Sequence, residues 1–288
     1  MIRLACELPA ESEVPLARWS SGELAREAVA RGICEQISGV TVWRWLSEDA
    51  IKPWQHRSWI FPRDPDFTAK AGRILDLYGG RWEGELLHPG DYVICADEKP
   101  SIQARKRIAK TLAAAPGEGL KVEHEYERMG ALCYFAAWDV RRAKIFGRCE
   151  PTSGIDPFDR LVAQVIGIEP YASARRVFLI VDNGSSHRGQ RSVARLAAKW
   201  PRSPELILIH LPIHASWLNQ VEIYFSIVQR KVLTPNDFAD LPAVEQRLLA
   251  FERHYEQIAQ PFQWTFTRPD LDRLLKQLDQ RQPLSLAA

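Results

Sequence analysis

The chain has 288 residues, of which 46% are hydrophobic and 26% are charged, and its formal net charge is +2. This composition is typical of a soluble globular protein, and no apolar run approaches the roughly 20 residues that a membrane-spanning helix needs. The first residues lack the basic and apolar regions of a secretory signal, so we expect a cytoplasmic protein without membrane contact. The five cysteines are scattered, which argues against a disulfide framework and a zinc site (Cys6, Cys34, Cys95, Cys133 and Cys149).

The N-terminal part is predicted to form two short helices. Ser20 and Glu23 have the spacing of a capping box, and Gly32 is a suitable helix end. A second helix is predicted over 40–48, with an apolar stripe of Val42, Trp45 and Leu46. The pair suggests a helix-turn-helix, although the long connection also fits an ordinary helical hairpin. Three tryptophans are expected in the core of this small unit (Trp19, Trp43 and Trp45).

The next segment, 52–67, has three prolines, several aromatic residues and basic side chains but no regular period, so it is predicted to be a linker. A helix follows at about 67–78. Strands and helices then alternate, which predicts an α/β fold with a mixed sheet flanked by helices. The predicted strands are 91–97, 130–139, 144–149, 176–182 and 205–212, and the predicted helices are 157–168, 186–200, 217–232 and a helical tail over 241–282.

Two of the predicted strands end in an aspartate. Asp97 closes the run DYVICAD, and Asp182 closes RVFLIVD. Strand ends are where open α/β sheets place their ligand sites, and these two strands can lie side by side. Glu222 is predicted near the start of a helix whose buried stripe is formed by Leu218, Val221, Phe225 and Val228. Three acidic side chains are therefore expected at one edge of the sheet.

Three converging carboxylates repel one another unless cations neutralise them. Oxygen ligands suit hard divalent metals, and a pair of Mg²⁺ or Mn²⁺ ions would support phosphodiester chemistry. The alternative is that each acid caps a loop or pairs with a nearby arginine. The position of all three, at two strand ends and one helix start, favours a metal site. Histidine ligation of zinc (His124, His187, His210 and His214) and a serine hydrolase site at Ser185 and Ser186 are weaker alternatives, because the expected spacing and motif are missing.

Three blocks of the chain resemble the signature motifs of bacterial insertion-sequence transposases of the mariner-like superfamily, which have a DDE catalytic core on an RNase H-like fold. The blocks are ADEKPSIQAR (96–105), LIVDNGSSHRG (179–189) and LPIHASWLNQVEIYFSIVQRK (211–231). The resemblance extends from about Glu23 to Phe238. It implies that Asp97, Asp182 and Glu222 are the catalytic triad and bind the metals, with 39 residues between the second and third members.

The resemblance also implies roles beside or on the DNA for Asn183, His187 and Asn219. Trp217 and Gln220 stand where many relatives have proline, so the start of the last helix is expected to differ. The family forms dimers on its DNA, so we expect a homodimer that binds the terminal inverted repeats and target DNA. Many relatives carry a further helix-turn-helix before the part seen here. We therefore expect a truncated copy that retains its chemistry but binds its ends weakly.

Basic residues mark the expected DNA-binding surfaces. The segment 99–148 has eleven Lys or Arg and five acids, a net charge of +6. Such clusters attract phosphate backbones, although a solvated surface has the same composition. The residues expected to contact DNA are Arg44 in the second helix, Lys52 and Arg57 in the linker, and Lys99, Arg105, Lys106 and Arg107 after the first acid.

The sequence thus predicts four regions: a helix-turn-helix segment (1–51), a linker and connecting helix (52–90), an RNase H-like catalytic domain (91–238) and a helical C-terminal tail (239–288). The predicted function is a DNA transposase that cuts at transposon ends and transfers strands into target DNA, associated with the nucleoid when bound. Two alternatives remain open. One is an RNase H-like nuclease without strand transfer, and the other is an inactive DNA-binding protein derived from a transposase.

Overall fold

The computed structural model describes residues 1–48, 51–55, 62–201 and 204–281. These residues form two compact units, Met1–Phe61 and Pro62–Ala288. The first unit contains α1 (Ile2–Ala5), the 3₁₀ turn η1 (Pro9–Ser12), α2 (Ser21–Ala30) and α3 (Gly39–Glu48). None of the helices described here is long and apolar enough to cross a membrane.

The two predicted N-terminal helices are present as α2 and α3. The capping box is confirmed, because Ser20 Oγ accepts from the Glu23 amide at 3.2 Å and the Glu23 carboxylate accepts from the Ser20 amide at 2.8 Å. The helices approach closely at two glycines: a Cβ on Gly39 would lie 3.1 Å from the Gly22 Cα. A larger residue at Gly39 would push against α2, whereas a Cβ on Gly22 would meet no atom closer than Arg26 Nη1 at 4.0 Å.

The core of this unit differs from the sequence expectation at two tryptophans. Trp19 is buried and its indole donates to the Glu7 carbonyl at 2.9 Å. Trp43 and Trp45 are 53% and 45% exposed, so the prediction that they lie in the core is wrong. The core is filled instead by smaller residues of α2 and α3 at helical spacing (Leu24, Ala28, Val42 and Leu46), which already occupy the contact between the helices.

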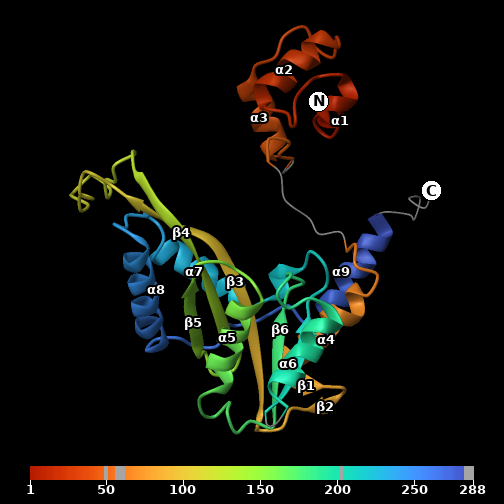
Figure 1. Ribbon diagram of the computed structural model, residues 1–288. Helices are drawn as coiled ribbons and strands as arrows, with labels where there is room; N and C mark the ends of the chain where they lie inside the picture. The colour runs from red at the N-terminus through yellow and green to blue at the C-terminus, as the bar shows by residue number, and fades with distance from the viewer. Residues whose placement is uncertain (49–50, 56–61, 202–203, 282–288) are drawn as a thin grey trace. The chain divides into compact units, whose positions relative to one another are not determined.

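The second unit is built on a five-stranded mixed sheet with the strand order β5-β4-β3-β6-β7 (Figure 1). Strands β3, β4 and β5 are antiparallel neighbours, and β3, β6 and β7 are parallel neighbours. This confirms a mixed sheet in which the strands of Asp97 and Asp182 lie side by side. The strands are β3 (Asp91–Lys106), β4 (Glu127–Asp139), β5 (Ile145–Glu150), β6 (Arg176–Val181) and β7 (Glu205–His210), with a separate hairpin of β1 (Arg81–Trp82) and β2 (Glu85–Leu86).

Helices cover both faces of the sheet. One core lies under α5 (Ile155–Ile166) and α6 (Gly189–Lys199). The other, larger core lies under four helices: α4 (Phe67–Tyr78), α7 (Val221–Lys231), α8 (Leu241–Glu256) and α9 (Arg268–Arg281). The alternation of side chains along a strand sends successive residues of β3 to opposite cores, so Cys95 contacts the larger core and Ala96 the smaller one.

The tail after residue 238 closes the larger core and is not helical throughout. The predicted helical tail over 241–282 is present as two helices, α8 and α9, which a non-helical segment at 257–267 separates. Aromatic residues of this segment pack on the sheet and its helices: Phe262 stacks on Trp138 with ring centroids 4.3 Å apart, and Trp264 meets Tyr78 at 5.2 Å. The tail is therefore part of the fold of the second unit.

Candidate active site

Asp97 lies in the interior of β3 and not at its end. The prediction that the strand stops at Asp97 is wrong, because β4 continues to pair with β3 as far as Lys106. The parallel pairing with β6, however, runs only from Asp91–Arg176 to Cys95–Ile180. Asp182 follows the last residue of β6 directly. Asp97 and Asp182 therefore stand where the two parallel strands part, which is the edge that the sequence predicts for a ligand site.

Two neighbours fix the Asp97 carboxylate, which is only 8% exposed. Its Oδ1 accepts from the Glu98 amide at 2.8 Å, and its Oδ2 accepts from Asn219 Nδ2 at 3.3 Å. The same Asn219 nitrogen also donates to the Ala96 carbonyl at 3.2 Å, while Asn219 Oδ1 is buried without a hydrogen-bond partner among the described residues. Burial, together with the nearby charges of Asp182 and Glu222, raises the pKa of Asp97 to about 8.

Asp182 is held by the loop that follows it. Its Oδ1 accepts from the Gly184 amide at 2.7 Å and is hydrogen-bonded to His187 Nε2. The His187 hydrogen bond is the main reason that the pKa of Asp182 lies below its ordinary value. Gly184 is required by this geometry, because an added Cβ would lie 2.9 Å from Asp182 Oδ1. The sequence NGSSH thus forms a tight turn around the carboxylate.

His187 is fully buried and is fixed at several atoms. Its Nδ1 is hydrogen-bonded to Ser186 Oγ at 2.9 Å, and its ring packs against Phe158 at 4.8 Å between centroids. Its carbonyl accepts from Ser192 Oγ and from His210 Nε2, both at 2.6 Å. The imidazole is therefore packed against α5, and the His187 backbone is tied to α6 and β7, so the ring can hold Asp182 in one orientation.

Asn183 has a different position from the other two residues that the resemblance singles out. Its Nδ2 donates to the Leu211 carbonyl at 2.8 Å, which joins the end of β6 to the end of β7. His187 contacts Asp182 and Asn219 contacts Asp97, whereas Asn183 contacts the backbone. These three residues all lie at the carboxyl edge of the sheet.

Glu222 is the second residue of α7. The predicted helix over 217–232 is interrupted, since a 3₁₀ turn, η2 (Ser216–Leu218), precedes the α-helix that begins at Val221. Asn219 and Gln220 lie between them, so the break coincides with the departure from the family pattern. Burial and the charge of Asp182 raise the pKa of Glu222, while Lys99 opposes that shift. Glu222 is therefore within electrostatic reach of both Asp182 and Lys99.

Glu98 is a further acidic residue of the site that the sequence reasoning missed. It is partly buried, and its Oε2 has no hydrogen-bond partner among the described residues. Burial is the main cause of its raised pKa, to which Asp182 adds and which His187 opposes. Because neighbouring residues of a strand point to opposite faces, Asp97 and Glu98 flank the sheet edge from both sides. The adjacent acids in ADEK were the available signal.

The residues expected to bind DNA are not gathered at one place. Lys99, Arg105 and Arg107 line a pocket beside the second half of β3, whereas Lys106 is outside its lining and lies 3.8 Å from Glu127. Arg44 and Lys52 are exposed residues of the first unit. Arg57 lies outside the described residues.

Comparison with known protein families identifies the family of this chain. The family described as "DDE superfamily endonuclease" matches residues 92–245, which include Asp97, Asp182 and Glu222. The chain belongs to the DDE superfamily endonucleases. No curated protein sequence matches the chain.

Solved structures of the mariner transposase Mos1 share the fold of this DDE endonuclease. A paired-end complex with Mg gives a TM-score of 0.56 at 13% identity over 95% of this chain and 76% of the Mos1 chain. A paired-end complex with Mn gives 0.55 at 14% identity, covering 96% and 76%, and a strand transfer complex gives 0.52 at 14% identity, covering 97% and 75%. The sheet with its flanking helices is therefore RNase H-like, as the sequence predicts.

The acids of this DDE endonuclease fit divalent metals by their chemistry. Asp97, Glu98, Asp182 and Glu222 offer oxygen ligands, and the elevated pKa of Asp97 reflects its burial first and then the nearby negative charges, which a hard cation would neutralise. Among the described residues, however, no three His, Cys, Asp or Glu side chains are gathered closely enough to hold an ion. The donor set is present, and its members repel one another unless a cation neutralises them.

Proposed function

We propose that this DDE endonuclease is a transposase that uses Asp97, Asp182 and Glu222 to cut DNA at the ends of a mobile element and to join the freed 3′ ends to target DNA. One observation carries the proposal. Asp97 of β3, Asp182 directly after β6 and Glu222 of α7 lie at one edge of the sheet, near enough for the charges of Asp182 and Glu222 to act on Asp97, and within the described part of the chain none of them forms an ion pair with Arg or Lys. Acids that only stabilise a fold are usually paired when they are buried.

Asp97, Asp182 and Glu222 would hold the metal, with two Mg²⁺ or Mn²⁺ ions as the expected complement. Such ions activate the attacking hydroxyl or water and stabilise the leaving oxygen of a phosphodiester. The protein's own contribution is orientation. Asn219 orients the Asp97 carboxylate and His187 orients the Asp182 carboxylate, so that each carboxylate would bind a metal ion in a defined position. These two residues act through the acids and are positioning residues.

DNA recognition is proposed for the first unit and for Lys99, Arg105 and Arg107, which follow Asp97 and line one pocket. Arg44 on α3 and Lys52 are exposed, as contacts to a DNA backbone require, and Arg57 remains a proposal from sequence. The Mos1 structures are paired-end and strand transfer complexes, which supports terminal repeats and target DNA as partners. We extend the same reasoning to a homodimer on DNA and to an origin in an insertion sequence.

Two other functions share parts of this geometry. A nuclease without strand transfer would use the same acids but would not join 3′ ends. An inactive DNA-binding descendant would bind DNA without cutting it, and the presence of all three acids argues against it. The two steps of the reaction, cutting and joining, separate the three possibilities.

The decisive experiment measures cleavage of a labelled duplex that carries the element's own ends, in Mg²⁺ or Mn²⁺ and in EDTA. Asp182→Asn should abolish metal-dependent cuts at the ends, whereas Asp156→Asn, the same change at an exposed acid of α5, should cut like the wild type. A second substrate with a free 3′-hydroxyl and a plasmid target measures joining. Cutting without joining would support the nuclease, and DNA binding without metal-dependent cutting would support the inactive descendant.

A further inference from the structure

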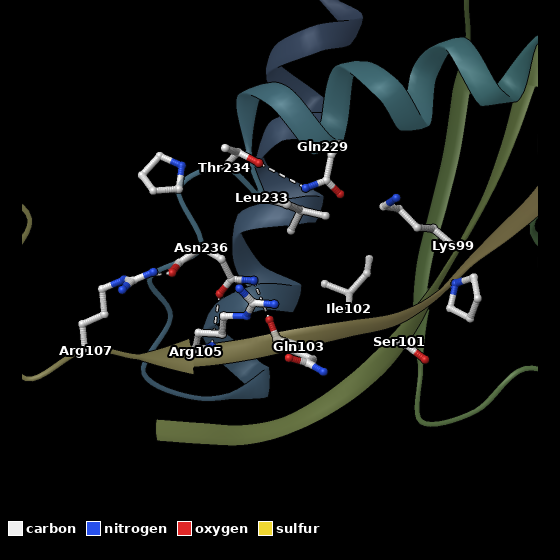
Figure 2. Close-up of a pocket in the computed structure, with 12 residues that line it drawn as sticks. Lys99, Ser101, Ile102, Gln103, Arg105, Arg107, Gln229, Leu233, Thr234 and Asn236 are labelled. Atoms are coloured by element: carbon white, nitrogen blue, oxygen red, sulfur yellow. Dashed lines mark hydrogen bonds between the residues drawn. The ribbon is translucent and has the colours of Figure 1, made fainter. Parts of the chain in front are cut away.

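A pocket of about 450 Å³ lies between the second half of β3 and the end of α7 (Figure 2). One wall is formed by β3 between Lys99 and Arg105 together with Arg107 just beyond its end, and the other by Gln229 of α7 with the segment 233–236 that follows it. Three of the residues lining the pocket are cations (Lys99, Arg105 and Arg107), and none is an acid. The pocket is therefore positively charged.

The two arginines are held in place without an acidic partner. The Arg105 and Arg107 guanidinium groups lie over the ring of Tyr126, 4.7 Å and 5.7 Å from its centroid. Arg107 Nε also donates to the Asn236 carbonyl at 3.3 Å. Within the described residues, neither arginine forms an ion pair with Asp or Glu, and Arg105 Nε and Arg107 Nη1 are buried without a hydrogen-bond partner.

Such unpaired buried donors are costly, because a charged group that leaves water loses free energy unless another partner replaces it. An oxyanion inserted between the arginines would supply that partner. Two guanidinium groups provide planar arrays of donors that match the oxygens of a phosphate better than a lysine does. Their contacts with Tyr126 hold them before the ligand arrives, so that less side-chain entropy is lost on binding.

Hydrogen bonds along one edge of β3 hold the two walls of the pocket together. Beyond Cys95 this edge has no pairing with β6, and residues 236–238 cover part of it. Asn236 accepts from the Arg105 amide at 3.1 Å and donates to the Gln103 carbonyl at 2.7 Å, and the Phe238 amide donates to the Arg105 carbonyl at 3.0 Å. These bonds satisfy the backbone, so the arginine side chains remain available for a ligand.

The same two elements join this pocket to the acids. β3 carries both Asp97 and Arg105, and α7 carries Glu222 and, two turns later, Gln229. Lys99 links the two sites, since it lines the pocket and its charge acts on Glu222. Seven residues of helix span roughly 10 Å, which corresponds to about three nucleotides along one strand of duplex DNA.

We infer that this pocket binds one phosphate group of a DNA strand about three nucleotides from the bond that is cut. Arg105 and Arg107 supply the donors, and Lys106, although adjacent in sequence, takes no part. The inference rests on the proposed function for its substrate. It also sharpens the sequence expectation, which treats Lys99, Arg105, Lys106 and Arg107 as one set of equal contacts.

The test measures binding of the full chain to a labelled duplex in EDTA over a series of salt concentrations. Replacing both pocket arginines, Arg105→Gln with Arg107→Gln, should weaken binding about tenfold and lower the slope of log affinity against log salt by about 0.9, the value for one phosphate. Lys106→Gln is the matched control and should change affinity less than twofold. Equal losses in the control and the pocket variant would overturn the inference in favour of a diffuse basic surface.

A second pair of variants guards against misfolding. Gln229→Glu adds a negative charge at an exposed residue of the pocket wall, and Gln246→Glu makes the same change at an exposed residue of α8. The first should weaken DNA binding several-fold and the second should not. If Gln229→Glu binds DNA like the wild type, the pocket does not hold a DNA phosphate.

Inorganic phosphate distinguishes a DNA phosphate from a free anion. At constant ionic strength, we expect millimolar phosphate to compete only weakly with DNA. Displacement of DNA by micromolar phosphate would overturn the assignment in favour of a free-anion site. These binding measurements need no metal, so they can fail independently of the proposed function. If the wild type cleaves DNA but the double arginine variant has an unaltered salt slope, the pocket inference is wrong and the proposed function stands. If the double arginine variant binds DNA more weakly as expected but the wild type does not cleave DNA, the proposed function is wrong and the pocket inference stands.

Discussion

Two buried aspartates six residues apart on β3 have opposite surroundings. Asp91, 3% exposed, accepts from Arg176 at 3.1 and 2.6 Å and from the His88 amide at 3.0 Å. Burial acts to raise its pKa, but the Arg176 hydrogen bonds and the amide outweigh it and hold the pKa below the ordinary value. Asp97, 8% exposed, faces other acids, and burial with their charge raises its pKa to about 8.

The difference separates an acid that stabilises the fold from an acid that is available for chemistry. Asp91 closes the amino-terminal end of the parallel pair β3-β6 by bonding to the first residue of β6. Asp97 stands at the other end of the same pairing and weakens the fold when it is charged. A buried acid without a cation is retained at a cost in stability, which is what a site for an external cation requires.

The largest expected effect concerns activity. Asp97→Asn should reduce metal-dependent cleavage by at least about 1,000-fold, because it removes a ligand charge for the metal. Asp91→Asn should leave the rate per folded molecule unchanged at a temperature where the variant is folded. Single-turnover cleavage, corrected for the folded fraction by circular dichroism, provides the measurement. A comparable loss of rate in Asp91→Asn would erase the distinction between the two acids.

The next effect concerns stability, where Asp91→Asn is expected to be the more damaging of the two substitutions. Asp91→Asn should lower the free energy of unfolding by about 2 kcal/mol, since it leaves Arg176 without its partner. Asp97→Asn should not lower it in metal-free buffer. Urea titrations of both variants at pH 7 in EDTA compare them directly. If Asp97→Asn proves the less stable of the two, Asp97 is a structural acid and the site assignment fails.

A smaller effect is expected from the residue that orients Asp182. His187→Ala should reduce cleavage or raise the metal concentration needed for half-maximal rate by about 10- to 100-fold, as for other residues that orient a metal ligand. His187→Gln, which retains a hydrogen-bond donor, should recover part of the loss. A Mg²⁺ titration of the rate tests this prediction, because a role confined to folding would change the folded fraction without shifting the metal dependence.

The smallest expected effect concerns pH. The pKa of Asp97 is higher in the folded protein than its ordinary value of 3.8, so folding favours the protonated form and stability falls as pH rises from about 4 to about 8. At pH 8 without metal, Asp97→Asn should therefore be more stable than the wild type, and at pH 4 the difference should vanish. Mg²⁺ should stabilise the wild type and reverse the order at pH 8. Thermal melts of both proteins at both pH values, with Mg²⁺ or EDTA, test this prediction. If Asp97 binds no cation, Mg²⁺ will leave the order of the two melting temperatures at pH 8 unchanged.

The alternation of strands and helices was predictable from sequence because hydrophobic periodicity is a local property. The neighbouring positions of the two strands that bear Asp97 and Asp182 followed from topology rules for α/β sheets. The length of β3 was not predictable, since its second half is polar and becomes a strand only through pairing with β4. The exposure of Trp43 and Trp45 was missed for a related reason: apolar character at helical spacing does not say whether a partner covers that face.

The site shows the same limit. The placement of Asp97 and Asp182 at one edge of the sheet was predictable from their motifs, but Glu98 was missed because its surroundings depend on the charge of Asp182 and on the loop that carries His187. The arginine pocket also depends on distant residues, since Tyr126 and Asn236 are 21 and 131 residues from Arg105 in the sequence. Contacts at such separations leave no local pattern.

The extended segment between α8 and α9 limits how this chain can be shortened. The family match ends at residue 245, yet Phe262 stacks on the buried Trp138 of β4 and Leu271 is fully buried in the larger core. A recombinant fragment cut to 92–245 would also lack α4, which packs under the same face. The compact unit is thus longer than the segment that matches the family. A fragment for biochemical work on the second unit should begin near residue 62 and retain α9.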